Sequence, residues 1–151
     1  MREFAQGVQA QKADRLTEAI RAYRRATQLD PAYYDAYYNL GLASTAAGNL
    51  SQAVAAYENA LAIRPDSVDA RYNFALVLKQ SNHPLDAADQ LEKILAAYPN
   101  EPRAHLALGN LYSQQLQQPA KAREHYLRLL ELDPQSRQAG AILFWLKENS
   151  P

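Results

Sequence analysis

Residues 34–67 read YDAYYNLGLASTAAGNLSQAVAAYENALAIRPDS and predict two helices joined by a turn. In each half, small and apolar residues recur at spacings of three and four, which is the periodicity of one helix face. Gly48-Asn49 separates the halves, and Pro65 ends the unit. A hairpin of two such helices has an apolar face on each helix and too little core to be stable alone. We therefore expect it to pack against neighbours of the same kind.

Such neighbours are present, because the pattern recurs along the chain. One column of small residues repeats every 34 positions, since 41−7, 75−41 and 109−75 are all 34. The last step in the other columns is 35 (for the closing proline, 134−99), which indicates one inserted residue around Gln117-Gln118. The columns are Gly7, Gly41, Ala75, Gly109; Ala19, Ala53, Ala87, Ala122; Tyr23, Tyr57, Leu91, Tyr126; Ala26, Ala60, Ile94, Leu129; and Pro31, Pro65, Pro99, Pro134.

A 34-residue period with two small columns, an aromatic column and a closing proline resembles the tetratricopeptide repeat. The resemblance implies an all-α, right-handed α-solenoid of four helix-turn-helix repeats and a C-terminal capping helix. We place the repeats at about 1–33, 34–67, 68–101 and 102–136, with the capping helix at about 136–148, in a single domain over 1–151. The small columns let helix axes approach closely, and the large columns fill the space between hairpins.

Within this frame the helix ends can be placed. In the first repeat we expect helices Arg2–Lys12 and Arg15–Gln28, with Asp14 as the cap of the second. Glu3 and Gln6 stand where the family has large apolar residues. They indicate either a solvated terminal face or an end that once packed on more chain. In the third repeat we expect helices near 67–81 and 84–97, with Pro84 at the first helical position. In the fourth, we place the inserted residue in the turn.

Composition limits the classes of function. The chain has 16 basic and 16 acidic residues, and a net charge of zero argues against a nucleic-acid binder. No apolar run approaches the roughly 18 residues of a membrane helix, so we expect no membrane insertion. No signal peptide is evident; the compartment is unknown, with the cytoplasm as the default. There is no cysteine for a disulfide or thiolate site.

No catalytic or metal-binding constellation is evident. His83, His105 and His125 form no pair at helical spacing, so we expect no metal site. His105 stands in a packing column and is expected at the core or its edge. There is no glycine-rich phosphate loop and no nucleophile elbow. We therefore predict a non-enzymatic protein without cofactors.

The family resemblance implies that first helices line a concave groove that binds peptides or helices. By register, the fifth and ninth positions of the repeats are Phe4 and Val8, Tyr38 and Leu42, Tyr72 and Leu76, and Leu106 and Asn110. The two residues of each pair are four positions apart, so they share one helix face. This face differs from the packing face, which carries Leu40, Phe74 and Leu108. We predict a protein partner that presents an apolar or aromatic segment to this stripe. The alternative is that tight curvature or neighbouring helices bury these positions.

Two asparagines, Asn39 and Asn73, stand beside the stripe at the sixth position. An amide can donate to and accept from a peptide backbone, so we expect them to hold the partner. One class in the family grips a terminal carboxylate with lysines, an arginine and asparagines. Only Asn39 fits that pattern, and Asp69 has the wrong sign, so we expect no carboxylate clamp.

The tail suggests a rival function. Ala139, Ile142, Leu143 and Leu146 fall on one face suited to covering the fourth repeat, whereas Phe144 and Trp145 fall largely outside it. These aromatics either lie along the edges of a capping helix or contact a second subunit or partner. A homodimer formed through Phe144 and Trp145 is the alternative to the groove.

Overall fold

The computed structural model describes all 151 residues, and all of its regular structure is α-helical. None of its helices is both long and apolar enough to cross a lipid bilayer. The helices are α1 (Arg2–Lys12), α2 (Leu16–Leu29), α3 (Tyr34–Ala46), α4 (Leu50–Ile63), α5 (Val68–Gln80), α6 (Pro84–Ala97), α7 (Pro102–Gln114), α8 (Pro119–Leu132) and α9 (Ala139–Glu148). The predicted all-α class is confirmed, and Pro84 is the first residue of α6, as expected.

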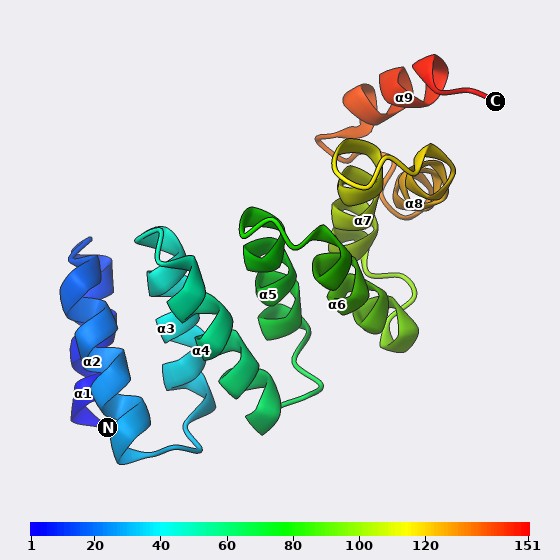
Figure 1. The fold of residues 1–151 in the computed structure, drawn as a ribbon. Coiled ribbons are helices and arrows are strands. Elements are labelled where there is room, and N and C mark those ends of the chain that lie inside the picture. Colours follow the sequence, from blue (N-terminus) through cyan, green and yellow to red (C-terminus); the bar gives the residue numbers. More distant parts are fainter. The chain divides into compact units, whose positions relative to one another are not determined.

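The chain divides into two compact units, Met1–His83 with α1 to α5 and Pro84–Pro151 with α6 to α9 (Figure 1). In the first unit each helix packs on the next along the chain, and α3 also contacts α5. In the second unit α7 contacts both α6 and α8, and α8 contacts α9. The boundary falls in the turn between the two helices of the predicted third repeat. The single domain over 1–151 and its repeat limits stay predictions.

The turn inside each helix pair contains one residue in the left-handed region. Asp14, Gly48, Asn82 and Gln117 have φ of 56°, 75°, 62° and 50°. The prediction that Asp14 caps α2 is therefore wrong. Arg15 is the N-cap residue there and makes no side-chain cap bond, whereas Asn49, one repeat later, accepts from the backbone N–H of Gln52. Asp14 instead takes the left-handed conformation that the turn needs, which aspartate tolerates better than most residues.

The inserted residue lies in a turn. Three residues separate α5 from α6 (81–83), and four separate α7 from α8 (115–118). Both second helices have 14 residues, so the insertion leaves the helix periodicity intact, as predicted.

The small column packs directly on the aromatic column. A β-carbon added to Gly7 would lie 2.5 Å from the Tyr23 ring, and one added to Gly41 would lie 2.7 Å from the Tyr57 ring. In the second unit, Gly109 has the same relation to Tyr126, at 2.5 Å. Each of these rings therefore occupies the space that a side chain on the facing helix would need.

The buried faces follow the expected packing columns. Leu40 and Phe74 are buried in the first unit, and Leu108 is buried in the second. One core cluster of the first unit joins α1 to α4 through Ala10, Ala19, Tyr23, Leu40, Ala43 and Ala56, with Phe4, Val8 and Ile20 packed against it.

Candidate functional site

The predicted stripe of the first unit lies on its first helices, α1, α3 and α5. Tyr38 and Leu42 on α3 and Tyr72 and Leu76 on α5 are all half-buried. The neighbouring packing positions, Leu40 and Phe74, are buried. Solvent therefore reaches the stripe, whereas the packing face is closed.

Phe4 and Val8 on α1 are also half-buried, but they serve the interior. Both pack against the core cluster of the first unit. The Phe4 ring lies 5.7 Å from the Tyr23 ring and 5.0 Å from the Tyr33 ring, centroid to centroid. Of the predicted stripe, the α3 and α5 members are thus the more independent of the core cluster.

Tyr38 is held in place from three sides. Its ring stacks on Tyr34 with a centroid distance of 5.9 Å and meets Tyr57 edge-on at 6.2 Å. Its hydroxyl oxygen accepts a hydrogen bond of 3.0 Å from Asn73 Nδ2 on α5. The ring therefore needs little further ordering to serve as a contact surface, which lowers the entropic cost of binding.

The two predicted backbone-holding amides already make bonds within the chain. Asn73 donates to Tyr38, and Asn39 Nδ2 donates to the backbone carbonyl oxygen of Asp35 at 2.7 Å. An amide has two N–H groups and a carbonyl oxygen, so each keeps further hydrogen-bonding capacity. Asn73 also orients the Tyr38 ring, a role that the sequence argument missed.

A pocket of about 420 Å³ opens beside Tyr38, at the loop between α4 and α5. Its lining is Tyr34, Asp35, Tyr38, Arg64, Asp66, Ser67, Val68 and Asp69. The Tyr34 hydroxyl and Ser67 Oγ are hydrogen-bonded at 2.6 Å, and the Arg64 guanidinium lies 4.3 Å from the centre of the Tyr34 ring. This pocket extends the accessible surface of α3 past Tyr38.

In the second unit, the predicted lining residues lie on α7. Leu106 is half-buried. The side-chain oxygen of Asn110 accepts a 2.8 Å bond from the Tyr126 hydroxyl, which is also 3.0 Å from Ser113 Oγ. Asn110 therefore helps to hold α8 on α7.

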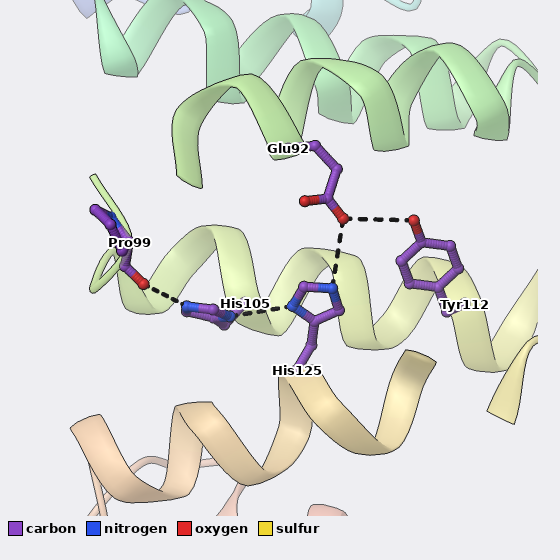
Figure 2. A network of polar contacts seen from close by, with 5 residues as sticks. All are labelled: Glu92, Pro99, His105, Tyr112 and His125. Carbon is purple, nitrogen blue, oxygen red and sulfur yellow. Dashed lines mark hydrogen bonds and ion pairs between the residues drawn. The ribbon is translucent and has the colours of Figure 1, made fainter. Parts of the chain in front are cut away.

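Two histidines that are far apart in the sequence meet in the second unit (Figure 2). His105 on α7 and His125 on α8 approach to 3.1 Å between their Nδ1 atoms. His105 Nε2 is 2.7 Å from the carbonyl oxygen of Pro99, and His125 Nε2 is 3.5 Å from Glu92 Oε1 on α6. Tyr112 donates to the same Glu92 oxygen at 3.5 Å. His105 is buried, as its packing column predicted.

Burial affects the protonation of His125. Desolvation is the largest influence on His125 and lowers its pKa, and the nearby Glu92 carboxylate offsets this only in part. The search for helical pairs could not find these histidines because they belong to different helices. The signal lay in the register: positions 105 and 125 correspond to 37 and 56 of the second repeat, on the facing helices of one hairpin.

The tail helix differs from its prediction. Ile142 and Leu146 are buried against the second unit, but Leu143 is 58% exposed. Trp145, predicted outside the stripe, is half-buried and meets the Tyr126 ring edge-on at 5.1 Å. The covering face is thus 142, 145 and 146, an equally good helical stripe. Phe144 is 67% exposed. Of the two predicted oligomer contacts, only Phe144 faces solvent.

No three side chains among His, Asp and Glu converge in the way that a metal ion requires. No curated protein sequence matches the chain.

Comparison with family profiles and solved structures identifies the fold. One profile described as TPR repeat matches residues 12–44 and again residues 44–82, and a second, described as tetratricopeptide repeat, matches residues 72–137. Among solved structures, MamA is 21% identical with a TM-score of 0.86, over 94% of this chain and 83% of that one. A tetratricopeptide repeat protein from Parabacteroides merdae is 22% identical with a TM-score of 0.89, over 97% of this chain and 58% of its own.

A third similar structure is that of YrrB, described as a TPR protein with an unusual peptide-binding site. It is 20% identical with a TM-score of 0.75, over 98% of this chain and 78% of that one. The repeat register, the glycine–tyrosine packing and the profile matches lead to one conclusion. The chain belongs to the tetratricopeptide repeat family.

Proposed function

We propose that the chain is a non-enzymatic protein-binding scaffold whose first unit receives an apolar or aromatic segment of its partner. The segment lies against Tyr38, Leu42, Tyr72 and Leu76. The observation that carries the proposal is the contrast between two faces of the same helices. The packing face is closed, whereas the stripe is apolar, aromatic and only half-buried.

The chemistry of the stripe suits such a partner. Tyrosine provides a large rigid contact area with few rotatable bonds and a polar end, and it is enriched at binding hot spots. The Asn73–Tyr38 hydrogen bond fixes the ring on α3 relative to α5 before the partner arrives. The remaining donor and acceptor groups of Asn39 and Asn73 then meet the partner's backbone.

The test uses the whole chain and peptides selected from a displayed random-peptide library. We expect the selected peptides to share large apolar or aromatic residues. The double variant Tyr38→Ala, Tyr72→Ala should weaken their binding at least about 30-fold, the equivalent of one strong hot spot. Fluorescence anisotropy measures the affinity, and circular dichroism checks that helical content is retained.

The matched control is Tyr98→Ala, because Tyr98 is 51% exposed and lies in the loop between α6 and α7. Its affinity should equal that of the unmodified chain. Unchanged affinity in the double variant would rule out the stripe as the binding surface. Loss of helical content in that variant would instead identify the two rings as structural.

A second candidate function is self-association through the tail. Leu143 and Phe144 are adjacent on α9 and 58% and 67% exposed. A pocket of about 650 Å³ lies beside the α8 residue Leu127, with the C-terminal residues Asn149 to Pro151 in its lining. Analytical ultracentrifugation of the chain and of Phe144→Ser tests this function. A monomer at high concentration would exclude it.

A further inference from the structure

The hydrogen-bonding partners of His105 fix the position of its proton. A carbonyl oxygen can only accept, so His105 Nε2, 2.7 Å from the Pro99 oxygen, carries the hydrogen. The Nδ1 atom of the neutral ring is then a bare acceptor. That atom is the one that faces His125 at 3.1 Å (Figure 2).

The position of the proton on His125 follows from this. To form the contact, His125 Nδ1 must donate to His105 Nδ1, because two bare nitrogens cannot hydrogen-bond. The neutral His125 ring therefore turns a bare Nε2 toward Glu92 Oε1, 3.5 Å away. One N–H on each ring is enough to hold the pair together.

Adding protons changes the contact in two steps. A first extra proton can enter at His125 Nε2, whose N–H then donates to the Glu92 carboxylate. A second proton can enter only at His105 Nδ1. The new N–H then points at the N–H already present on His125 Nδ1. Two donors would then face each other, on two imidazolium rings in contact and largely shielded from water, where charges repel more strongly.

The neighbouring charges are too few to compensate for this. From α6 the ring of His125 is faced by Glu92, from α7 by His105 and the stacked Tyr112, and from its own helix by Glu124. Glu92 is 48% exposed, so water screens its attraction. The Lys121 ammonium, 5.1 Å from the centre of the Tyr112 ring, adds positive charge to the same region.

We propose that the His105–His125 contact is an acid-sensitive clasp, which holds α7 on α8 near neutral pH and opens when both rings are protonated. The clasp lies next to the binding surface predicted for the second unit. Leu106 follows His105 on α7, and Asn110 is bonded to Tyr126, the neighbour of His125. We expect opening of the clasp to loosen α7, which carries this part of the lining.

Burial lowers the pKa of His125, so the folded second unit already resists the first of the two protons. An ordinary histidine has a pKa of about 6.5. When the folded state has the lower pKa, the unfolded chain takes up the proton first as the pH falls. Unfolding of the second unit then becomes more favourable below about pH 6.5.

The only tryptophan provides a local readout of this unit. Trp145 packs edge-on against Tyr126, so its fluorescence follows the packing of α9 on α8. We expect the urea unfolding constant from this signal to rise between about pH 6.5 and pH 5, by at most about tenfold per pH unit for each excluded proton. His125→Gln should remove most of this rise, and His105→Gln should remove the part that comes from the second proton.

His83→Gln is the matched control, because His83 is exposed and lies in the turn before α6. This variant should keep the full pH dependence. No rise in the unmodified chain, or the same rise in both clasp variants, would overturn the proposal.

A second test needs no variant. At neutral pH, nitrogen NMR of the side chains should show Nε2–H on His105 and Nδ1–H on His125. The opposite tautomer on either ring would also overturn it.

Discussion

A β-carbon on Gly41 would lie 2.7 Å from the ring of Tyr57, closer than such atoms approach in folded proteins. Tyr57 is only 1% exposed, so other atoms of the protein surround its ring. The same relation joins Gly7 to Tyr23 and, within the second unit, Gly109 to Tyr126. One steric fit therefore recurs in three of the hairpins.

Enlarging Gly41 should destabilise the fold. We expect Gly41→Leu to cost about 1–3 kcal/mol of unfolding free energy, because the added carbons meet a ring that cannot move away. Gly41→Ala should cost less unfolding free energy in a Tyr57→Leu background than in the unmodified chain, because a smaller side chain then faces the alanine. These are the residue types of the same columns at Ala75 and Leu91. Urea unfolding followed by circular dichroism measures the change.

Gly140→Ala is the control for backbone effects. Nothing lies within 4 Å of a β-carbon built at this helical position. The substitution should stabilise α9 by about 0.5–1 kcal/mol, because alanine loses less backbone freedom than glycine in a helix. A loss at Gly41 no larger than any change at Gly140 would contradict the packing explanation.

Replacing Gln117 by glycine should stabilise the second unit. Gln117 has a φ of 50°, in the left-handed region that costs a residue with a side chain roughly 1 kcal/mol. The α7–α8 turn is one residue longer than the others, yet it still holds Gln117 at a positive φ. Gln117→Gly should therefore raise the urea midpoint that Trp145 fluorescence reports. The reciprocal change, Gly48→Gln in the equivalent turn of the first unit, should lower stability. Opposite signs would refute the strain argument.

The two tail aromatics should differ in their effect on stability. Trp145→Ala removes a half-buried ring from Tyr126, and we expect a loss of roughly 1.5–2.5 kcal/mol, about half the cost of a fully buried aromatic. Phe144→Ala should change stability by less than about 0.5 kcal/mol, because the ring faces solvent. Thermal unfolding followed by circular dichroism at 222 nm compares the stabilities of the two variants. Equal losses would show that Phe144 also packs on the unit.

The buried tyrosines should make the protein sensitive to alkali. Burial raises the pKa of Tyr23, Tyr57 and Tyr126 above the usual value of 10.0. Above pH 10.0 the unfolded chain therefore loses these protons before the folded state does. The contribution of these groups to stability is complete below that pH and falls as the pH rises. For each such tyrosine, the unfolding constant rises by at most about tenfold per pH unit.

The variant Tyr57→Phe should weaken this alkaline dependence, because it removes one of the groups that must ionise on unfolding. The exposed Tyr98→Phe serves as its control and should leave the dependence unchanged. Absorbance of tyrosinate near 295 nm, recorded with circular dichroism, shows whether ionisation and unfolding coincide. Ionisation of all tyrosines without loss of helix would disprove the prediction.

The repeat register predicted the bounds of α1, α2, α5 and α6 within one residue, because it repeats the same constraints in each copy, whereas the tail helix begins at Ala139 and not at about 136. The register located α1 at Arg2–Lys12 and the insertion in the α7–α8 turn. It failed where two choices satisfy the same periodicity. In the tail AILFWL, both 142, 143, 146 and 142, 145, 146 form a helical stripe, and only packing on Tyr126 selects Trp145 over Leu143.

The sequence by itself determined the all-α class, the helix pairs and the recurring columns of small and aromatic residues, because these depend on residue spacing and size within one repeat. Tertiary structure alone decided which polar groups meet across helices. The Asn73–Tyr38 bond and the His105–His125 contact both join residues of different helices. A hydrogen bond depends on distances of a few tenths of an ångström and on direction, and periodicity fixes a helix face but not the separation between two faces.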